Sequence, residues 1–172
     1  MKSNLMVGAL VLVLAASGAS AAKAKHDINV LAVTKLSLTD AIGIGEKEGS
    51  GKAVDAELEA GKAPYYAVEV LSSDGKKLTE YKLDANSGKV IKASSEPLEK
   101  MLTRVKPADI QNAQTSLSSA IQAAERQSGG KVVDAETEGN ANTLHYELKV
   151  AMANGKTEKM KIDGATGKVA AK

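Results

Sequence analysis

The chain has 172 residues, with 23 basic and 21 acidic side chains and no cysteine. The lack of cysteine excludes disulfide cross-links, a lipid anchor on cysteine and cysteine ligands for zinc. The charge is nearly balanced and four tyrosines are the only aromatic residues, which argues against nucleic acid as a partner, because nucleic-acid-binding proteins need basic patches or stacking platforms.

Residues 1–21 have the form of a secretory signal peptide. Lys2 precedes an apolar run from Leu5 to Ala16, and Ala19-Ser20-Ala21 fits a small-residue cleavage site. The run is shorter than the about 20 residues that a membrane-spanning helix needs. The alternative is a buried N-terminal helix. We expect cleavage after Ala21, a mature chain that does not span the membrane, and a location in the periplasm or outside the cell.

Residues 22–35 are treated as an N-terminal segment of their own. The apolar stretch from Ile28 to Val33 is compatible with a strand, or with a tail that becomes ordered only on a neighbouring surface.

Residues 36–93 predict a unit in which one helix is followed by a four-stranded antiparallel sheet. Ser37 stands at the N-cap position with Asp40 at capping-box spacing, and Gly49-Ser50-Gly51 marks the end of the helix. The apolar residues between them have helical spacing: Leu38, Ala41, Ile42 and Gly45. Period-two alternation then predicts strands around four sequence positions: Val54–Leu58, Tyr66–Val70, Tyr81–Leu83 and Val90. Asp74-Gly75 favours a type I′ hairpin turn.

Residues 94–114 are predicted to be a structured connector. Pro97 lies where a helix can begin. Leu98, Met101, Leu102 and Val105 then follow helical spacing until Pro107, and a second short helical stretch through Ile110 leads into the next unit.

Residues 115–172 repeat the first unit. The stretch from Ser37 to Val90 recurs from Ser116 to Val169, displaced by 79 positions (116 − 37). The helical face returns as Leu117, Ala120, Ile121 and Ala124. The expected fold is therefore α+β, with two tandem units that each pack one helix on a four-stranded antiparallel sheet.

The repeated motifs resemble the PepSY domain family. They are the helix segments Ala41–Glu46 and Ala120–Glu125, the strand pattern G-K-x-V-D-A-E, a tyrosine-led strand, the D/N-G-K turn, and the closing segments Asp84–Val90 and Asp163–Val169. The resemblance implies a small helix-plus-sheet module that occurs in propeptides of secreted peptidases and in exported bacterial proteins, where it restrains peptidases or regulates proteins outside the membrane. It implies no catalytic role and no cofactor.

The candidate interaction surface consists of acidic residues that alternate along one strand of each unit. They are Asp55, Glu57 and Glu59 in the first unit and Asp134, Glu136 and Glu138 in the second. Carboxylates at alternate positions lie about 7 Å apart on one face of a strand. Such a face suits a basic partner or weakly held cations. The alternative is an ordinary solvated face on which Lys82 or Lys149 forms cross-strand pairs.

Other candidate sites are weaker. His145 replaces Tyr65 of the first unit, so it reads as a strand residue, and His26 lies near the mature N-terminus. The start of a calcium loop at Asp84 lacks the twelfth-position glutamate, and a tight turn at Gly88 explains the pattern. Neither a metal-ligand set nor a hydrolase triad emerges, and we expect no enzyme.

The sequence therefore predicts an exported, non-enzymatic module of PepSY type that binds a protein or a peptide. The expected partner is a peptidase or the outer part of a membrane protein, and one binding mode is the pairing of an extended peptide with a free sheet edge. The alternative function is an envelope cation-binding or stress protein that uses the acidic strand faces.

Overall fold

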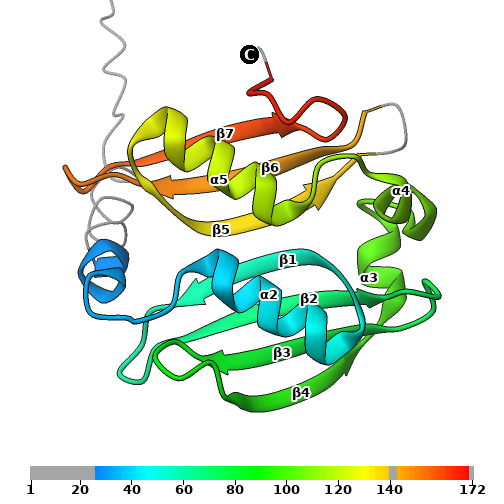
Figure 1. Cartoon of the computed structure of the whole chain (residues 1–172), viewed down its shortest axis with the longest axis horizontal. Helices are drawn as coiled ribbons and strands as arrows, with labels where there is room; N and C mark the ends of the chain where they lie inside the picture. The colour runs from blue at the N-terminus through cyan, green and yellow to red at the C-terminus, as the bar shows by residue number, and fades with distance from the viewer. Residues whose placement is uncertain (1–25, 140–142, 171–172) are drawn as a thin grey trace, which may run out of the picture.

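The computed structural model describes residues 26–139 and 143–170. Its strands form one continuous antiparallel sheet with the order β4-β3-β2-β1-β5-β6-β7 (Figure 1). The strands are β1 (Gly51–Glu59), β2 (Tyr65–Ser72), β3 (Leu78–Asp84), β4 (Val90–Glu96), β5 (Lys131–Glu138), β6 (His145–Ala151) and β7 (Thr157–Asp163). Two long helices, α2 (Leu38–Gly49) and α5 (Leu117–Ser128), cover the same side of this sheet. We call this side the helix face and the opposite side the open face.

Both long helices begin as the sequence predicts. The Ser37 hydroxyl accepts a hydrogen bond from the Asp40 N–H at 3.1 Å, and the Asp40 carboxylate accepts one from the Ser37 N–H at 2.9 Å, which completes a capping box. Ser116 caps α5 by accepting from the Ser119 N–H at 3.1 Å. Both helices end at a left-handed residue, which is Gly129 after α5 but Ser50 after α2. The predicted end of α2 at Gly49-Ser50-Gly51 is therefore confirmed, although Ser50 and not a glycine takes the left-handed conformation.

The hairpin turns differ from the prediction in type. A type I′ turn needs positive φ at both central residues, and only Gly75 (φ 70°) and Gly155 (φ 77°) have it in the two turns. Asp74 accepts a hydrogen bond from the Lys76 N–H, and Asn154 accepts one from the Lys156 N–H. These side chains thus stabilise the turns by bonding to the backbone two residues ahead.

The two units are joined edge to edge, which the sequence did not predict. Strand β1 pairs with β5 over three residue pairs, and the central pair joins Ala56 to Ala135. These alanines occupy equivalent positions in the repeat, so each unit uses the same edge and the pairing has a local two-fold axis. The second unit has three strands plus an isolated bridge between Ile162 and Val169. The expectation of two separate four-stranded sheets is therefore corrected to one shared seven-stranded sheet.

The main core lies on the helix face and crosses the junction. Its members are the inward residues of the two helices and of the strands that they cover, including Ile42, Tyr66, Val68, Ile121, Leu148 and Ile162, all of which are almost fully buried. Each unit also ties the segment before its helix to the sheet in the same way. The Tyr66 hydroxyl donates to the Leu36 carbonyl oxygen at 2.7 Å, and the Tyr146 hydroxyl donates to the Thr115 carbonyl oxygen. Burial raises the pKa of Tyr146 to about 12.

The connector covers one end of the open face. It contains α3 (Leu98–Leu102) and α4 (Pro107–Asn112), so both predicted helical stretches are confirmed. The Lys52 ammonium donates to the carbonyl oxygens of Ile110 and Gln111. Leu71 and Leu78 point away from α2 yet are 0% and 1% exposed, because the connector packs over them with its own buried side chains Met101, Val105 and Ile110.

The N-terminal segment does not form a strand where it is described, so that interpretation was wrong. Residues 26–31 form a short helix, and the His26 ring nitrogen Nε2 lies 2.6 Å from the Ala60 carbonyl oxygen at the end of β1. A short helix therefore precedes each unit, at α4 and at residues 26–31. The predicted signal peptide at residues 1–21 falls outside the described residues.

Replacing each of two glycines in α2 by alanine should have opposite effects on stability. A Cβ atom at Gly43 would meet nothing within 4 Å, so Gly43→Ala should raise the free energy of unfolding by about 1 kcal/mol through helix propensity. A Cβ atom at Gly45 would lie 3.0 Å from Cγ1 and 3.2 Å from Cβ of the buried Val68. We expect Gly45→Ala to lower the melting temperature in thermal denaturation. Equal gains for both variants would show that α2 does not pack closely on β2.

Candidate functional site

Four of the six predicted acidic residues meet at the junction between the units. The cross-strand register of β1 and β5 places Asp55 opposite Glu136 and Glu57 opposite Asp134. All four side chains lie on the open face, because the residues between them point toward the helices. The duplicated acidic stripe is therefore a single surface in which each half comes from one unit.

The two remaining predicted residues do not join this surface as pairs. Glu59 lies opposite Tyr65 and is exposed, and Glu138 lies opposite His145. Both stand at the far ends of their strands, beyond the three residue pairs that connect β1 and β5.

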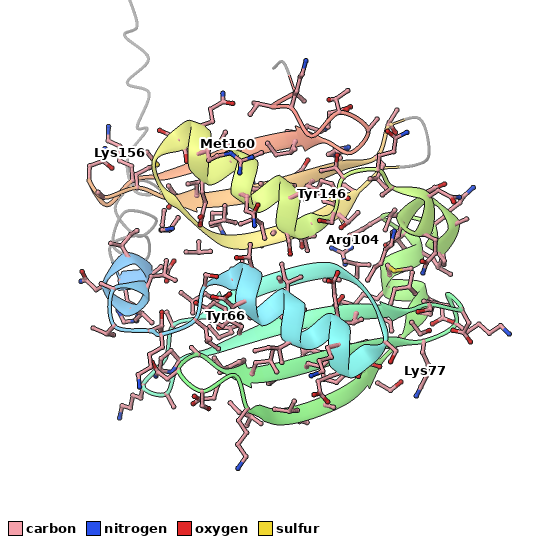
Figure 2. All side chains as sticks on the ribbon, in the orientation of Figure 1. Tyr66, Lys77, Arg104, Tyr146, Lys156 and Met160 are labelled. Carbon is pink, nitrogen blue, oxygen red and sulfur yellow. The ribbon has the colours of Figure 1, made fainter. Side chains whose placement is uncertain are left out.

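A single arginine from the connector bridges the two units. Arg104 follows α3, and its Nη1 lies 3.3 Å from Asp55 Oδ2 and 3.3 Å from Glu136 Oε1. Its Nη2 lies 3.7 Å from Glu69 Oε2. Figure 2 shows Arg104 beside the connector, where the two halves of the sheet meet. The guanidinium has several donors in a fixed plane, so it can serve carboxylates of both units at once.

Glu69 is the most deeply buried member of the cluster. Its side chain is 7% exposed, and Oε1 accepts a hydrogen bond from the Lys100 ammonium at 2.6 Å. Its other oxygen, Oε2, is buried and receives no hydrogen bond, so Arg104 acts on it only through charge. On the other side of the junction, Lys149 Nζ lies 2.8 Å from Asp134 Oδ2.

The surroundings of Asp55 disfavour its charge. Burial raises the pKa of Asp55 to about 7; repulsion from Glu69 and Glu136 adds to the effect and attraction to Arg104 opposes it. The Asp55 carboxyl therefore changes charge near neutral pH, whereas an ordinary aspartate does so near pH 4.

Apart from Lys149, these side chains line a groove of about 500 Å³ on the open face. Seven carboxylates line it against two basic side chains, Lys100 and Arg104. An excess of negative charge in a groove attracts cationic groups and raises their local concentration. The arrangement supplies electrostatic recognition and offers no nucleophile paired with a base.

Sequence reasoning missed Glu69, Lys100 and Arg104. One available signal was the adjacent apolar pair Val70-Leu71, which shows that both faces of β2 are covered at that end. A second signal was the apolar stripe of the connector, which needs an apolar surface to pack against. It consists of Leu98, Met101, Leu102 and Val105. Lys100 and Arg104 are one helical turn apart beside that stripe, so they follow it onto the sheet.

The other candidates have structural explanations. The Asp84 carboxylate accepts hydrogen bonds from the backbone and hydroxyl of Ser87 inside the turn that Gly88 closes with φ 69°, and these bonds lower the pKa of Asp84. His145 Nδ1 lies 2.7 Å from the Thr143 carbonyl oxygen. Among the residues that the structure describes, no group of three or more histidine, cysteine, aspartate or glutamate side chains is arranged to hold a metal ion.

The glutamates that close the repeated helix segments also have a structural role. Glu46 accepts a hydrogen bond from the Ala53 N–H, and Glu125 accepts one from the Val132 N–H. Both acceptors serve the start of the strand that follows, next to the register shift in each unit. They thus satisfy backbone donors where the ladder is interrupted.

Comparison with protein families identifies both repeats. The family model described as "Peptidase propeptide and YPEB domain", or PepSY, matches residues 35–93 and 115–172. The chain belongs to the PepSY family. PepSY domains are generally propeptide-like or inhibitor-like modules and not catalytic ones.

Two solved structures resemble this tandem PepSY chain. A lipoprotein candidate from Clostridium difficile 630 is 20% identical, with a TM-score of 0.47, and the match covers 80% of this chain and 92% of that one. The YpmB protein from Bacillus subtilis is 18% identical, with a TM-score of 0.32, and the match covers 77% and 93%. No match was found among curated proteins. The PepSY assignment rests on the family model alone.

No helix within residues 26–139 and 143–170 is both long and apolar enough to cross a membrane.

Proposed function

We propose that the chain is an exported, non-enzymatic module that binds a protein or an extended peptide and thereby restrains a peptidase or regulates an envelope protein in trans. The observation that carries this proposal is the fusion of two PepSY units into one sheet with a shared acidic open face. Export is supported by the signal-peptide pattern of residues 1–21. The absence of catalytic pairs among the described site residues fits a binding role.

The outer edge of β4 supports binding of an extended peptide. The sheet ends at β4 on one side and at β7 on the other. The edge of β7 is partly occupied, because Val169 bridges to Ile162 and the Ala170 N–H donates to the Lys161 carbonyl oxygen. In the described part of the chain β4 has no strand on its outer side, and its Ile91 side chain is 59% exposed. A peptide that pairs with β4 gains backbone hydrogen bonds and an apolar contact.

The acidic groove supports recognition of basic side chains. The proposed contact residues there are Asp55, Glu57, Glu59, Asp134 and Glu136, which all line the groove, whereas Glu138 at the end of β5 does not. Because like charges around a groove act together, a cationic partner would associate faster and at higher affinity at low salt.

An inhibition assay tests the proposal. We expect purified residues 22–172 to slow peptide hydrolysis by a secreted metallopeptidase such as thermolysin. Ile91→Glu tests the β4 edge, and Asp134→Lys with Glu57→Lys tests the groove. The variant that alters the surface through which the peptidase binds should weaken inhibition about tenfold, which corresponds to about 1.4 kcal/mol. Glu48→Lys, on the exposed side of α2, is the control and should change nothing.

The proposal fails if residues 22–172 neither slow the peptidase nor bind any member of an array of extended basic and apolar peptides. If both surface variants inhibit as well as the wild type, the protein binds through neither surface and the assignment of the contact residues is wrong.

A further inference from the structure

The junction of β1 and β5, which we call the seam, has fewer paired residues than any other pair of neighbouring strands in the sheet. Strands β1 and β5 share three residue pairs, whereas β2 and β3 share seven. Two of the three junction pairs place a carboxylate directly opposite a carboxylate, Asp55 with Glu136 and Glu57 with Asp134. Like charges in directly opposite positions destabilise a strand pair. Like-charged pairs also occur elsewhere in the sheet, such as Glu69 opposite Glu80, but they are one of the seven pairs between β2 and β3 and two of the three pairs at the seam.

Basic side chains oppose this repulsion. Five carboxylates gather at the seam: Asp55, Glu57, Glu69, Asp134 and Glu136. Among the described residues, Arg104 bridges the units, Lys100 binds Glu69, and Lys149 binds Asp134. Arg104 is shared by carboxylates of both units, so a proton on one of those carboxyls changes how the units are held together.

The place where this proton acts most strongly is Asp55. Its carboxyl is 21% exposed and faces groups from every element packed on it: Glu69 on β2, Glu136 on β5, and Arg104 from the connector, with Lys100 of α3 behind Glu69. Arg104 Nη1 is shared equally, at 3.3 Å each, between Asp55 of one unit and Glu136 of the other. If Asp55 is neutral, the guanidinium can pair fully with Glu136 across the seam.

We propose that the β1–β5 seam is a latch that tightens in acid and loosens in alkali, because protonation of Asp55 relieves repulsion across the seam and frees Arg104 to hold Glu136. The direction agrees with the environment of Asp55, whose pKa is raised to about 7 by burial and by its neighbours. The latch couples the relative placement of the two PepSY units, and thus the shape of the groove between them, to the pH around the protein.

Hydrogen exchange by NMR on the purified chain, residues 22–172, tests the latch. Protection factors, which correct for the intrinsic effect of pH on exchange, are measured at pH 5.5 and pH 8.0 for β1 and β5 amides and for β2–β3 amides as an internal control. We expect protection at the seam to fall at least tenfold from pH 5.5 to pH 8.0. Seam amides should also be less protected than β2–β3 amides at both pH values, because the seam opens without global unfolding. Asp55→Asn, a neutral side chain of the same shape, should keep the seam protected at both pH values.

A second variant keeps the test decisive if Asp55→Asn does not fold. Glu136→Gln removes one repelling charge at a side chain that is 45% exposed, and it should move the midpoint of the change in seam protection to lower pH. The latch is refuted if protection at the seam is independent of pH, if seam amides are protected as strongly as β2–β3 amides at both pH values, or if either variant responds to pH as the wild type does.

Discussion

Replacing Arg104 by methionine should lower the free energy of unfolding by about 3 kcal/mol, because removing one partner of a buried ion pair leaves charge without compensation. Arg104 is 19% exposed and lies against Asp55 and Glu136 at 3.3 Å and Glu69 at 3.7 Å. The Glu69 side chain is 7% exposed and, among the described residues, would keep Lys100 as its one cationic partner. Methionine preserves much of the apolar stem, so the loss reports on charge. Urea denaturation at pH 7 measures it.

The size of this effect is checked by two further variants. Arg126→Met removes an exposed arginine from α5 and should change stability by less than about 0.5 kcal/mol, as is usual for surface sites. Combining Arg104→Met with Glu69→Gln should recover part of the loss, because the buried negative charge is gone. A double variant that is as unstable as the single one would contradict the electrostatic explanation and point to lost packing of the arginine stem.

The stability of the protein should decrease as the pH rises from 5 to 8. Asp55 has a pKa of about 7 in the folded chain, against 3.8 for an ordinary aspartate. Between these values the folded state binds a proton that the unfolded state has released, so the free energy of unfolding falls with pH by at most about 1.4 kcal/mol per unit. The stabilisation is complete below pH 3.8 and is lost as the pH rises through about 7. Because the side chain is partly exposed, we expect a total change of about 2 kcal/mol.

Chemical denaturation at pH 5, 6, 7 and 8 measures this change, and Asp55→Asn should abolish most of it. The pH range avoids carboxylates that act in the opposite direction. Hydrogen bonds lower the pKa values of Asp40, Asp84 and Asp163, so their contribution is lost only in more acidic solution. If the wild type gains stability between pH 5 and 8, Asp55 is not the dominant titrating group.

The local structure was predictable because its causes are local. The serine caps, the period of apolar residues and the Asp-Gly and Asn-Gly turns specify the helices and hairpins, and the turn explanation for Asp84–Gly88 is confirmed. Two local details differ from the prediction. The fourth strand of the second unit is reduced to the bridge at Val169, and Ser50 takes the left-handed conformation between two glycines.

The candidate site was predictable only in part. Alternation placed Asp55 and Glu57 on one face, but their meeting with Asp134 and Glu136 depends on a pairing between residues that are far apart in the chain. Apolar alternation is the same in a strand at an edge and in a strand at the centre of a sheet, so it does not show which edges join. Burial of Glu69 depends in turn on where the connector packs, which no periodicity in β2 specifies.

The pairing of Ala56 with Ala135 makes the edge of each unit complementary to itself. A chain with one such unit would need a second molecule to cover that edge, so its assembly would depend on the protein concentration. Here residues 94–114 tether the two copies, and a short tether keeps its partners at an effective concentration in the millimolar range. A contact too weak to hold two separate molecules together can therefore persist within this one chain.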